Sequence, residues 1–125
     1  ARARGLAQLV ACDIHPLNNT RVLKYLENED GMPQIERERW IRHWITLGFD
    51  ALEKILIDSP STGDFCEGDV PSIADCCLVP QIYNAQRWTI DLSPWPTIRR
   101  IHATCMALPA FEKARPENQP DAPQG

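Results

Sequence analysis

Two clusters of polar side chains have types that suit the binding of small anions. The first lies at the end of a long apolar stretch, where Asn84 and Arg87 follow Pro80 by four and seven residues. On a helix this spacing places both polar side chains on one face. A guanidinium group pairs with a carboxylate through two parallel hydrogen bonds, so this face suits a carboxylate ligand. The structural alternative is a solvated charge that favours the helix dipole, the commonest role of a single arginine near a helix end.

The second cluster is the segment His15-Pro-Leu-Asn-Asn-Thr-Arg21. Pro16 lacks an N–H and clashes with the carbonyl four residues earlier, so we expect a kink or break between two helical pieces here. Hydrogen-bonding side chains are dense where the helix is locally weakened, which favours contact with a ligand. The alternatives are that His15 bonds only the local backbone and that Asn18 and Asn19 are only turn formers.

The cysteines form neither a disulfide framework nor a metal motif. The chain contains Cys12, Cys66, Cys76, Cys77 and Cys105. An odd number, a vicinal pair in an apolar stretch and the absence of C-x-x-C favour reduced thiols in a cytoplasmic protein. Cys12 and His15 stand three residues apart, but no further ligands accompany them, so we predict no metal site.

Composition narrows the class of protein. The 125 residues suit one domain, and 13 basic against 17 acidic residues give a net charge of −4. An acidic balance gives no reason to expect nucleic acid as a partner. No apolar run approaches a membrane span and no signal peptide opens the chain, so we expect no membrane partner. Because the first residue is not methionine, we expect the chain to be one domain of a longer protein.

The element that must position the first cluster is a helix over residues 72–88. Ser72 and Asp75 have the spacing of a capping box, in which each side chain bonds the other residue's backbone N–H. The residues that follow leave no polar face, which predicts a buried central helix surrounded by the others: Ile73, Ala74, Cys76, Cys77, Leu78, Val79 and Ile82.

The remaining pattern predicts an all-α domain of five or six helices. Apolar residues recur at helical spacing over residues 1–14, 21–26, 33–58 and 97–108, with further turns over 109–115. The 33–58 helix carries two adjacent apolar stripes that together form a wide face. Residues 116–125 contain three prolines and no large aliphatic residue, so we predict a poorly ordered tail after a domain of residues 1–115.

Several strings in the sequence resemble those of one protein family. The capping box Ser72-Ile-Ala-Asp75 is shared by glutathione transferases generally. The strings Ile14-His-Pro-Leu-Asn-Asn19, Leu78-Val-Pro-Gln81 and Asn84-Ala-Gln-Arg87 are more specific and are similar to those of the zeta class. The resemblance covers nearly the whole chain and identifies it with the C-terminal helical domain of that class. The class includes the maleylacetoacetate and maleylpyruvate isomerases.

The resemblance implies an activity for the full-length protein. It implies a glutathione-dependent cis–trans isomerase that forms the fumaryl product during aromatic degradation, as in the tyrosine or gentisate pathway. Glutathione is then the cofactor and a small dicarboxylate keto acid the substrate. The family's N-terminal thioredoxin-like domain, which activates the thiol, is absent from this sequence and is an expected partner within the same protein. The family also implies a homodimer, and the 125 residues alone should be inactive.

The resemblance also implies roles for individual residues. It places substrate-carboxylate binding at Arg87, Arg21 and Asn84. It places glutathione binding at His15, Asn19, Thr20 and Arg21. It implies no catalytic residue in this chain, and Ser72 and Asp75 serve the fold. The alternative function is a non-catalytic, transferase-like helical module for protein contacts. The arginines and the His15–Arg21 cluster favour the enzyme, because a scaffold needs no carboxylate-binding groups beside a helix break.

Overall fold

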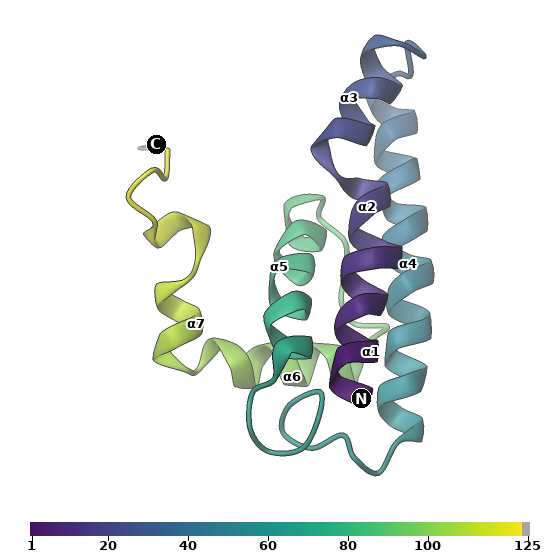
Figure 1. The fold of residues 1–125 in the computed structure, drawn as a ribbon. Helices are drawn as coiled ribbons and strands as arrows, with labels where there is room; N and C mark the ends of the chain where they lie inside the picture. The colour runs from purple at the N-terminus through teal and green to yellow at the C-terminus, as the bar shows by residue number, and fades with distance from the viewer. Residues whose placement is uncertain (124–125) are drawn as a thin grey trace.

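A computed structural model describes residues 1–123, and within them the chain is helical with no β-strand, which confirms the all-α prediction (Figure 1). The elements are α1 (Arg2–Gln8), a π-helical segment (Leu9–Ile14), α2 (His15–Asn18), α3 (Thr20–Asn28), α4 (Gln34–Asp58), α5 (Ile73–Arg87), α6 (Pro96–Met106), α7 (Pro109–Lys113) and a 3-10 turn (Pro116–Asn118). No helix among the described residues is long and apolar enough to cross a membrane.

The predicted break at residues 15–21 is much shorter in the structure. Residues 2–18 form one continuous helical rod, the first rod of the molecule. Helix α1, the π-helical segment and α2 run on without a gap, and the backbone N–H of His15 bonds the carbonyl of Val10, five residues earlier. The wider π turn accommodates Pro16, which cannot take part in the usual i−4 bonding. The rod ends only at Asn19, whose ψ of 143° is extended. The break is therefore one residue long.

Helix α4 buries one of its two predicted apolar stripes. The buried stripe, with Phe49 added, packs in the core: Ile41, Ile45, Leu52 and Leu56. The other stripe is only partly covered, since Leu47 is 54% exposed and Ile55 43%. The two stripes therefore do not form one buried face.

Helix α5 occupies the centre of the bundle, as predicted, and packs against α1, α6 and the π-helical segment (Figure 1). At its N-terminus the Ser72 hydroxyl accepts from the N–H of Ala74 at 3.2 Å. The Asp75 carboxylate accepts from the N–H of Ser72 at 2.8 Å. The helix is not buried on every side, however, because Ile73 is 59% exposed and Cys76 is exposed. An apolar sequence did not by itself determine how many sides are covered.

The C-terminus of α5 is closed by its own backbone and by α4. The N–H groups of Thr89 and Ile90 bond the carbonyls of Gln86 and Ala85, at 2.9 and 3.1 Å. Thr89 has a positive φ of 54° in this turn, the conformation that usually follows a helix end. From α4, the Arg42 guanidinium donates to the carbonyl of Trp88 at 2.7 Å. These bonds hold the last turn of α5, which carries Arg87.

Helix α6 begins on a carboxylate from α4. Glu53 is buried, and its two oxygens accept from the N–H groups of Thr97 at 2.8 Å and Ile98 at 2.9 Å. A carboxylate at a helix N-terminus accepts hydrogen bonds from the free N–H groups there. Its negative charge also interacts favourably with the helix dipole. Nearby, the indole N–H of Trp95 donates to Asp50 at 2.7 Å. Residues distant in the sequence thus cap α6.

The chain beyond α7 includes the segment predicted as a poorly ordered tail. Residues 116–123 contain the 3-10 turn, and the Asn118 amide donates to the carbonyl of Glu112 at 2.7 Å. The Gln119 amide donates to the carbonyls of Lys113 and Arg115. Residues 124 and 125 of the predicted tail lie outside the described residues.

Candidate functional site

The predicted carboxylate-binding side chains of α5 lie in its last turn. Asn84 is partly buried, and Arg87 is exposed, with no hydrogen bond or ion pair from its side chain to any of residues 1–123. Arg87 is also the last residue of a helix whose end is held by Arg42 and by the Thr89 turn. An anchored backbone and an unpaired guanidinium make Arg87 available to an anion from solvent.

The second cluster is organised around Asn19. Its side-chain oxygen accepts from the N–H of Arg21 at 3.0 Å and so caps α3. Its amide nitrogen lies 3.3 Å from Nε2 of His15; an amide nitrogen can only donate, so Nε2 is the acceptor. Both side chains therefore have a local structural role, which the sequence offered as an alternative to ligand contact. Thr20 and Arg21 are exposed and form no side-chain hydrogen bond within the described residues.

A tryptophan from α4 anchors this cluster. The indole N–H of Trp40 donates to the carbonyl of Leu17 at 2.8 Å. Leu17 lies in α2 between His15 and Asn19, so the bond fixes the short helix against α4. Trp40 and Leu17 are 23 residues apart, and a partner so far along the chain cannot be identified from sequence.

The two clusters lie at one level of the molecule without forming a closed pocket. Figure 1 shows the C-terminal end of α5 at the height of α2, while α3 continues above them. Three cavities on residues 1–123 are lined by other side chains and by none of the predicted site residues: His15, Asn19, Thr20, Arg21, Asn84 and Arg87. The arrangement is an open surface with two unpaired guanidinium groups.

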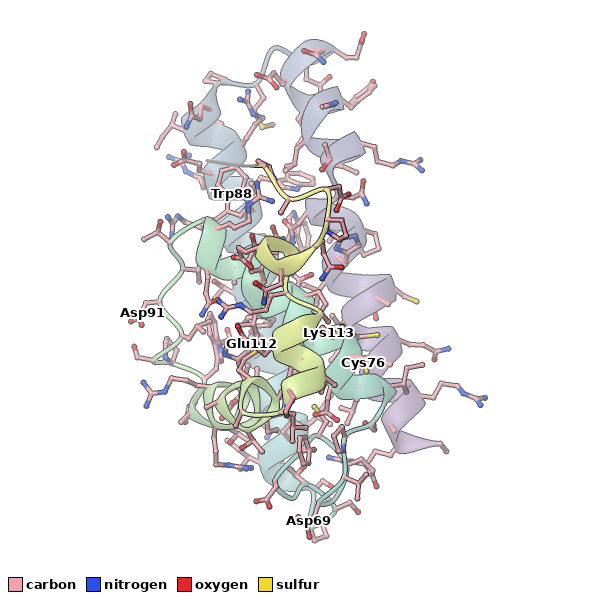
Figure 2. The ribbon with its side chains drawn as sticks, turned by 90° about the vertical axis from the view of Figure 1, so that its left-hand side faces the viewer. Asp69, Cys76, Trp88, Asp91, Glu112 and Lys113 are labelled. Atoms are coloured by element: carbon pink, nitrogen blue, oxygen red, sulfur yellow. The ribbon has the colours of Figure 1, made fainter. Side chains whose placement is uncertain are left out.

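An apolar groove, which we did not predict, follows the exposed side of α5. It has a volume of about 490 Å³. Helix α5 contributes five side chains at helical spacing: Cys76, Val79, Pro80, Tyr83 and Gln86. Residues of α6 and of the α7 region form the other wall, and Figure 2 shows α7, with Glu112 and Lys113, in front of α5. The sequence did contain a signal for this groove. Helix α5 has more apolar residues than one buried face requires, so some of them must lie on a second face.

One imidazole lines this groove. Burial lowers the pKa of His102, and the positive charge of Arg115 lowers it further. His102 is therefore held in its neutral form more firmly than a free histidine, which suits an apolar contact surface. The groove combines an apolar floor with few charges.

Asp75 links the start of α5 to two buried thiols. Its carboxylate accepts from the N–H of Cys66 at 2.9 Å and lies 3.9 Å from the sulfur of Cys105. Burial, and then the negative charge of Asp75, raises the pKa of Cys105 to about 12 and raises the pKa of Cys66 still further. Both thiols stay protonated at neutral pH, so neither can act as a nucleophile. Within residues 1–123 no three metal-ligating side chains form a group that fits an ion.

Comparison with known proteins gives relatives along nearly the whole chain, although no protein-family model matches it. The chain is 49% identical over 121 residues to a probable maleylacetoacetate isomerase of Vibrio cholerae. That match covers 97% of the chain and 55% of the relative. The chain therefore spans about half the length of the curated relatives that it matches.

Solved structures agree with this assignment. A holo structure of maleylpyruvate isomerase, a bacterial glutathione transferase of the zeta class, superposes with a TM-score of 0.94 at 46% identity, over 98% of this chain and 57% of that one. A maleylacetoacetate isomerase from Methylobacterium extorquens AM1, with bound malonate and glutathione, gives 0.93 at 40% identity, again over 98% and 57%. On sequence and fold together, the chain matches the C-terminal helical domain of zeta-class glutathione transferases.

Proposed function

We propose that this chain is the substrate-binding domain of a glutathione-dependent cis–trans isomerase. Its full-length protein would convert maleylacetoacetate or maleylpyruvate to the fumaryl product in the cytoplasm. The observation that carries the proposal is Arg87, an unpaired guanidinium on the anchored end of α5, in a chain whose relatives are named as such isomerases. Arg21 at the start of α3 supplies a second unpaired guanidinium.

The exposed donors near Asn19 fit glutathione. This ligand presents carboxylates and amide groups, which accept hydrogen bonds from guanidinium, hydroxyl and imidazole N–H groups. Arg21 and Thr20 are free to donate, and His15 and Asn19 keep part of their bonding capacity. When bound at these residues, glutathione would supply the thiol nucleophile for the isomerisation.

The residues of this chain would hold and orient the substrate rather than react with it. Arg87 would pair with one carboxylate of the substrate, and Asn84, one turn earlier, would donate to a carboxylate or keto oxygen. Because the C–C bond must rotate between the two anionic ends, fixing one end at α5 leaves the other free to turn. Arg21 would neutralise charge near the second end. The chain contributes position and charge, and the thiol is activated elsewhere.

The remaining partners belong to the same proposal. The thioredoxin-like domain would occupy the apolar groove along α5, which offers a cavity of about 490 Å³ beside exposed apolar side chains. The full-length protein would be a homodimer. The partly exposed α4 stripe with Leu47 and Ile55 supports a further interface, because apolar side chains that share one helix face seldom remain in solvent.

The test is Arg87→Ala in the full-length protein. Losing a bond to a charged group typically costs about 1.5–3 kcal/mol, so KM for the dicarboxylate should rise at least about tenfold. Arg87→Lys should recover only part of the loss because it lacks the planar fork. The control is Arg99→Ala, which removes an exposed arginine of α6 and should leave KM unchanged. Unchanged kinetics in Arg87→Ala would remove Arg87 from the site, and a full-length protein without isomerase activity would favour the non-catalytic module.

A further inference from the structure

Three buried polar atoms lack a hydrogen-bond partner within residues 1–123. They are both amide atoms of Gln81 and the side-chain oxygen of Asn18. Gln81 is 2% exposed and Asn18 is 5% exposed. Buried polar groups nearly always have a partner, and the common partner that is not protein is ordered water. The two amides therefore require an explanation beyond the protein contacts.

Gln81 lies in α5, and Asn18 lies in α2, which continues the π-helical segment that packs on α5. The face of α5 that carries Gln81 also carries three buried apolar residues: Ala74, Leu78 and Ala85. Asp75, about 100° further round the helix, faces α6, because it contacts Cys105. This leaves the Gln81 face for the other neighbours of α5, namely α1 and the π-helical segment. Asn18 ends the same rod, one turn beyond that segment, and its amide donates to the carbonyl of Ile14 at 3.3 Å.

No hydrogen bond or ion pair joins residues 1–28 to residues 73–88 in the described chain. The buried residues of the first rod and of α5 are apolar except for Asn18, Gln81 and Asp75. Gln81 offers a donor and an acceptor, and Asn18 offers an acceptor. A water molecule, which donates two bonds and accepts two, matches this set.

We propose that ordered water between Gln81 and Asn18 links α5 to α2, and that Gln81 is thereby a positioning residue for the isomerase site. Gln81 lies one turn before Asn84, and Asn18 adjoins Asn19. The link thus joins the two segments that carry the ligand-binding groups and sets their separation. The positioning role rests on the proposed function, whereas the link itself does not.

The experiment uses the full-length protein with Gln81→Met, Asn18→Leu and the double variant. Met and Leu keep much of the side-chain volume and remove the polar atoms. With water in place, Gln81→Met should lower the folding equilibrium constant at least about fivefold, the cost of losing paired polar groups. In the double variant the folding equilibrium constant should fall by less than the product of the two single decreases. Either single change already removes the water link, so the second change cannot remove it again. A raised folding constant in Gln81→Met, or independent effects, would overturn the link.

A matched core variant separates positioning from stability. Ile82→Val changes the next residue of α5, which is fully buried and apolar. Gln81→Met should raise KM for the dicarboxylate at least about threefold, and Ile82→Val should leave it unchanged. An equal rise in both variants would reduce Gln81 to a structural residue. If neither the parent nor any variant shows isomerase activity, the proposed function fails. The folding measurements still test whether the water link exists. A crystal structure that resolves ordered water tests the link directly. No water bonded to the Gln81 amide in that structure would contradict the proposal.

Discussion

At the scale of single residues, the acidic and thiol groups of the core serve the fold, whereas the exposed arginines remain available for ligands. Asp75 accepts bonds from Ser72 and from the N–H of Cys66, so its negative charge is satisfied although the residue is fully buried. Arg21 and Arg87 are exposed and have no such partner within residues 1–123. A buried charge that is fully paired stabilises structure, whereas an exposed unpaired one can bind.

The Cys105 thiol predicts how stability depends on alkaline pH. Its pKa is raised from an ordinary value of 9.0 to about 12 in the folded state. Below pH 9 the thiol is protonated in both states and contributes no pH dependence. Between pH 9 and about 12 only the unfolded state loses the proton, so the free energy of unfolding should fall by up to about 1.4 kcal/mol per pH unit.

Denaturant titrations between pH 8 and 10 measure this slope. Cys105→Ala should make the slope shallower than in the parent, whatever its effect on absolute stability. Cys12→Ala removes an exposed thiol and should keep the parent slope. Equal slopes in parent and Cys105→Ala would show that Cys105 does not contribute.

At the scale of elements, close packing decides where a poor helix former is the best residue. Gly48 lies in the middle of α4, where glycine costs about 1 kcal/mol relative to alanine. A Cβ at this position would lie 2.6 Å from Cδ1 of Ile14 and would also clash with Cγ1. The π-helical segment therefore approaches α4 more closely than any side chain at position 48 permits.

Gly48→Ala should consequently reverse its effect when Ile14 is truncated. In the parent the overpacking, about 1–3 kcal/mol, exceeds the gain in helix propensity, so thermal or denaturant unfolding should show a net loss of stability. In an Ile14→Ala background both clashing atoms are absent, and Gly48→Ala should gain about 1 kcal/mol. A loss of equal size in both backgrounds would mean that Ile14 is not the obstacle.

At the scale of the whole molecule, residues 1–123 combine two exposed, unpaired guanidinium groups with an apolar groove, while two of their thiols lie buried. The buried thiols of Cys66 and Cys105 stay protonated. Cys76 and Pro80 line the groove along α5 and are exposed, although both are apolar residues. On the proposed function, the thioredoxin-like domain would cover this groove.

The isolated 125 residues should therefore show no isomerisation of maleylacetoacetate or maleylpyruvate in the presence of glutathione. The group that lowers the thiol pKa belongs, on the proposed function, to the other domain. The full-length protein assayed under the same conditions is the control and should be active. Measurable turnover by the isolated chain, monitored by loss of the maleyl substrate, would contradict this expectation.

Features that depend on neighbouring residues can be read from the order of residues alone. The capped start of α5, the long helix α4 and the clusters at His15–Arg21 and Asn84–Arg87 all follow from spacing along one chain. Such features are readable because a helix bonds residues three to four apart. The strings that resemble the zeta class are equally local, and they are sufficient to predict the family.

Features that depend on residues far apart are set by how the helices pack. Packing determines which α4 stripe is buried and leaves one side of α5 exposed. It also stabilises the π-helical segment that accommodates Pro16. It also brought Glu53 to the start of α6 and Arg42 to the end of α5. Long-range contacts of this kind leave no periodic signal, because a cap or a packing partner can come from any part of the chain. Spacing along α5 thus placed Asn84 and Arg87 on one face, and only the packed bundle decided what holds that face in position.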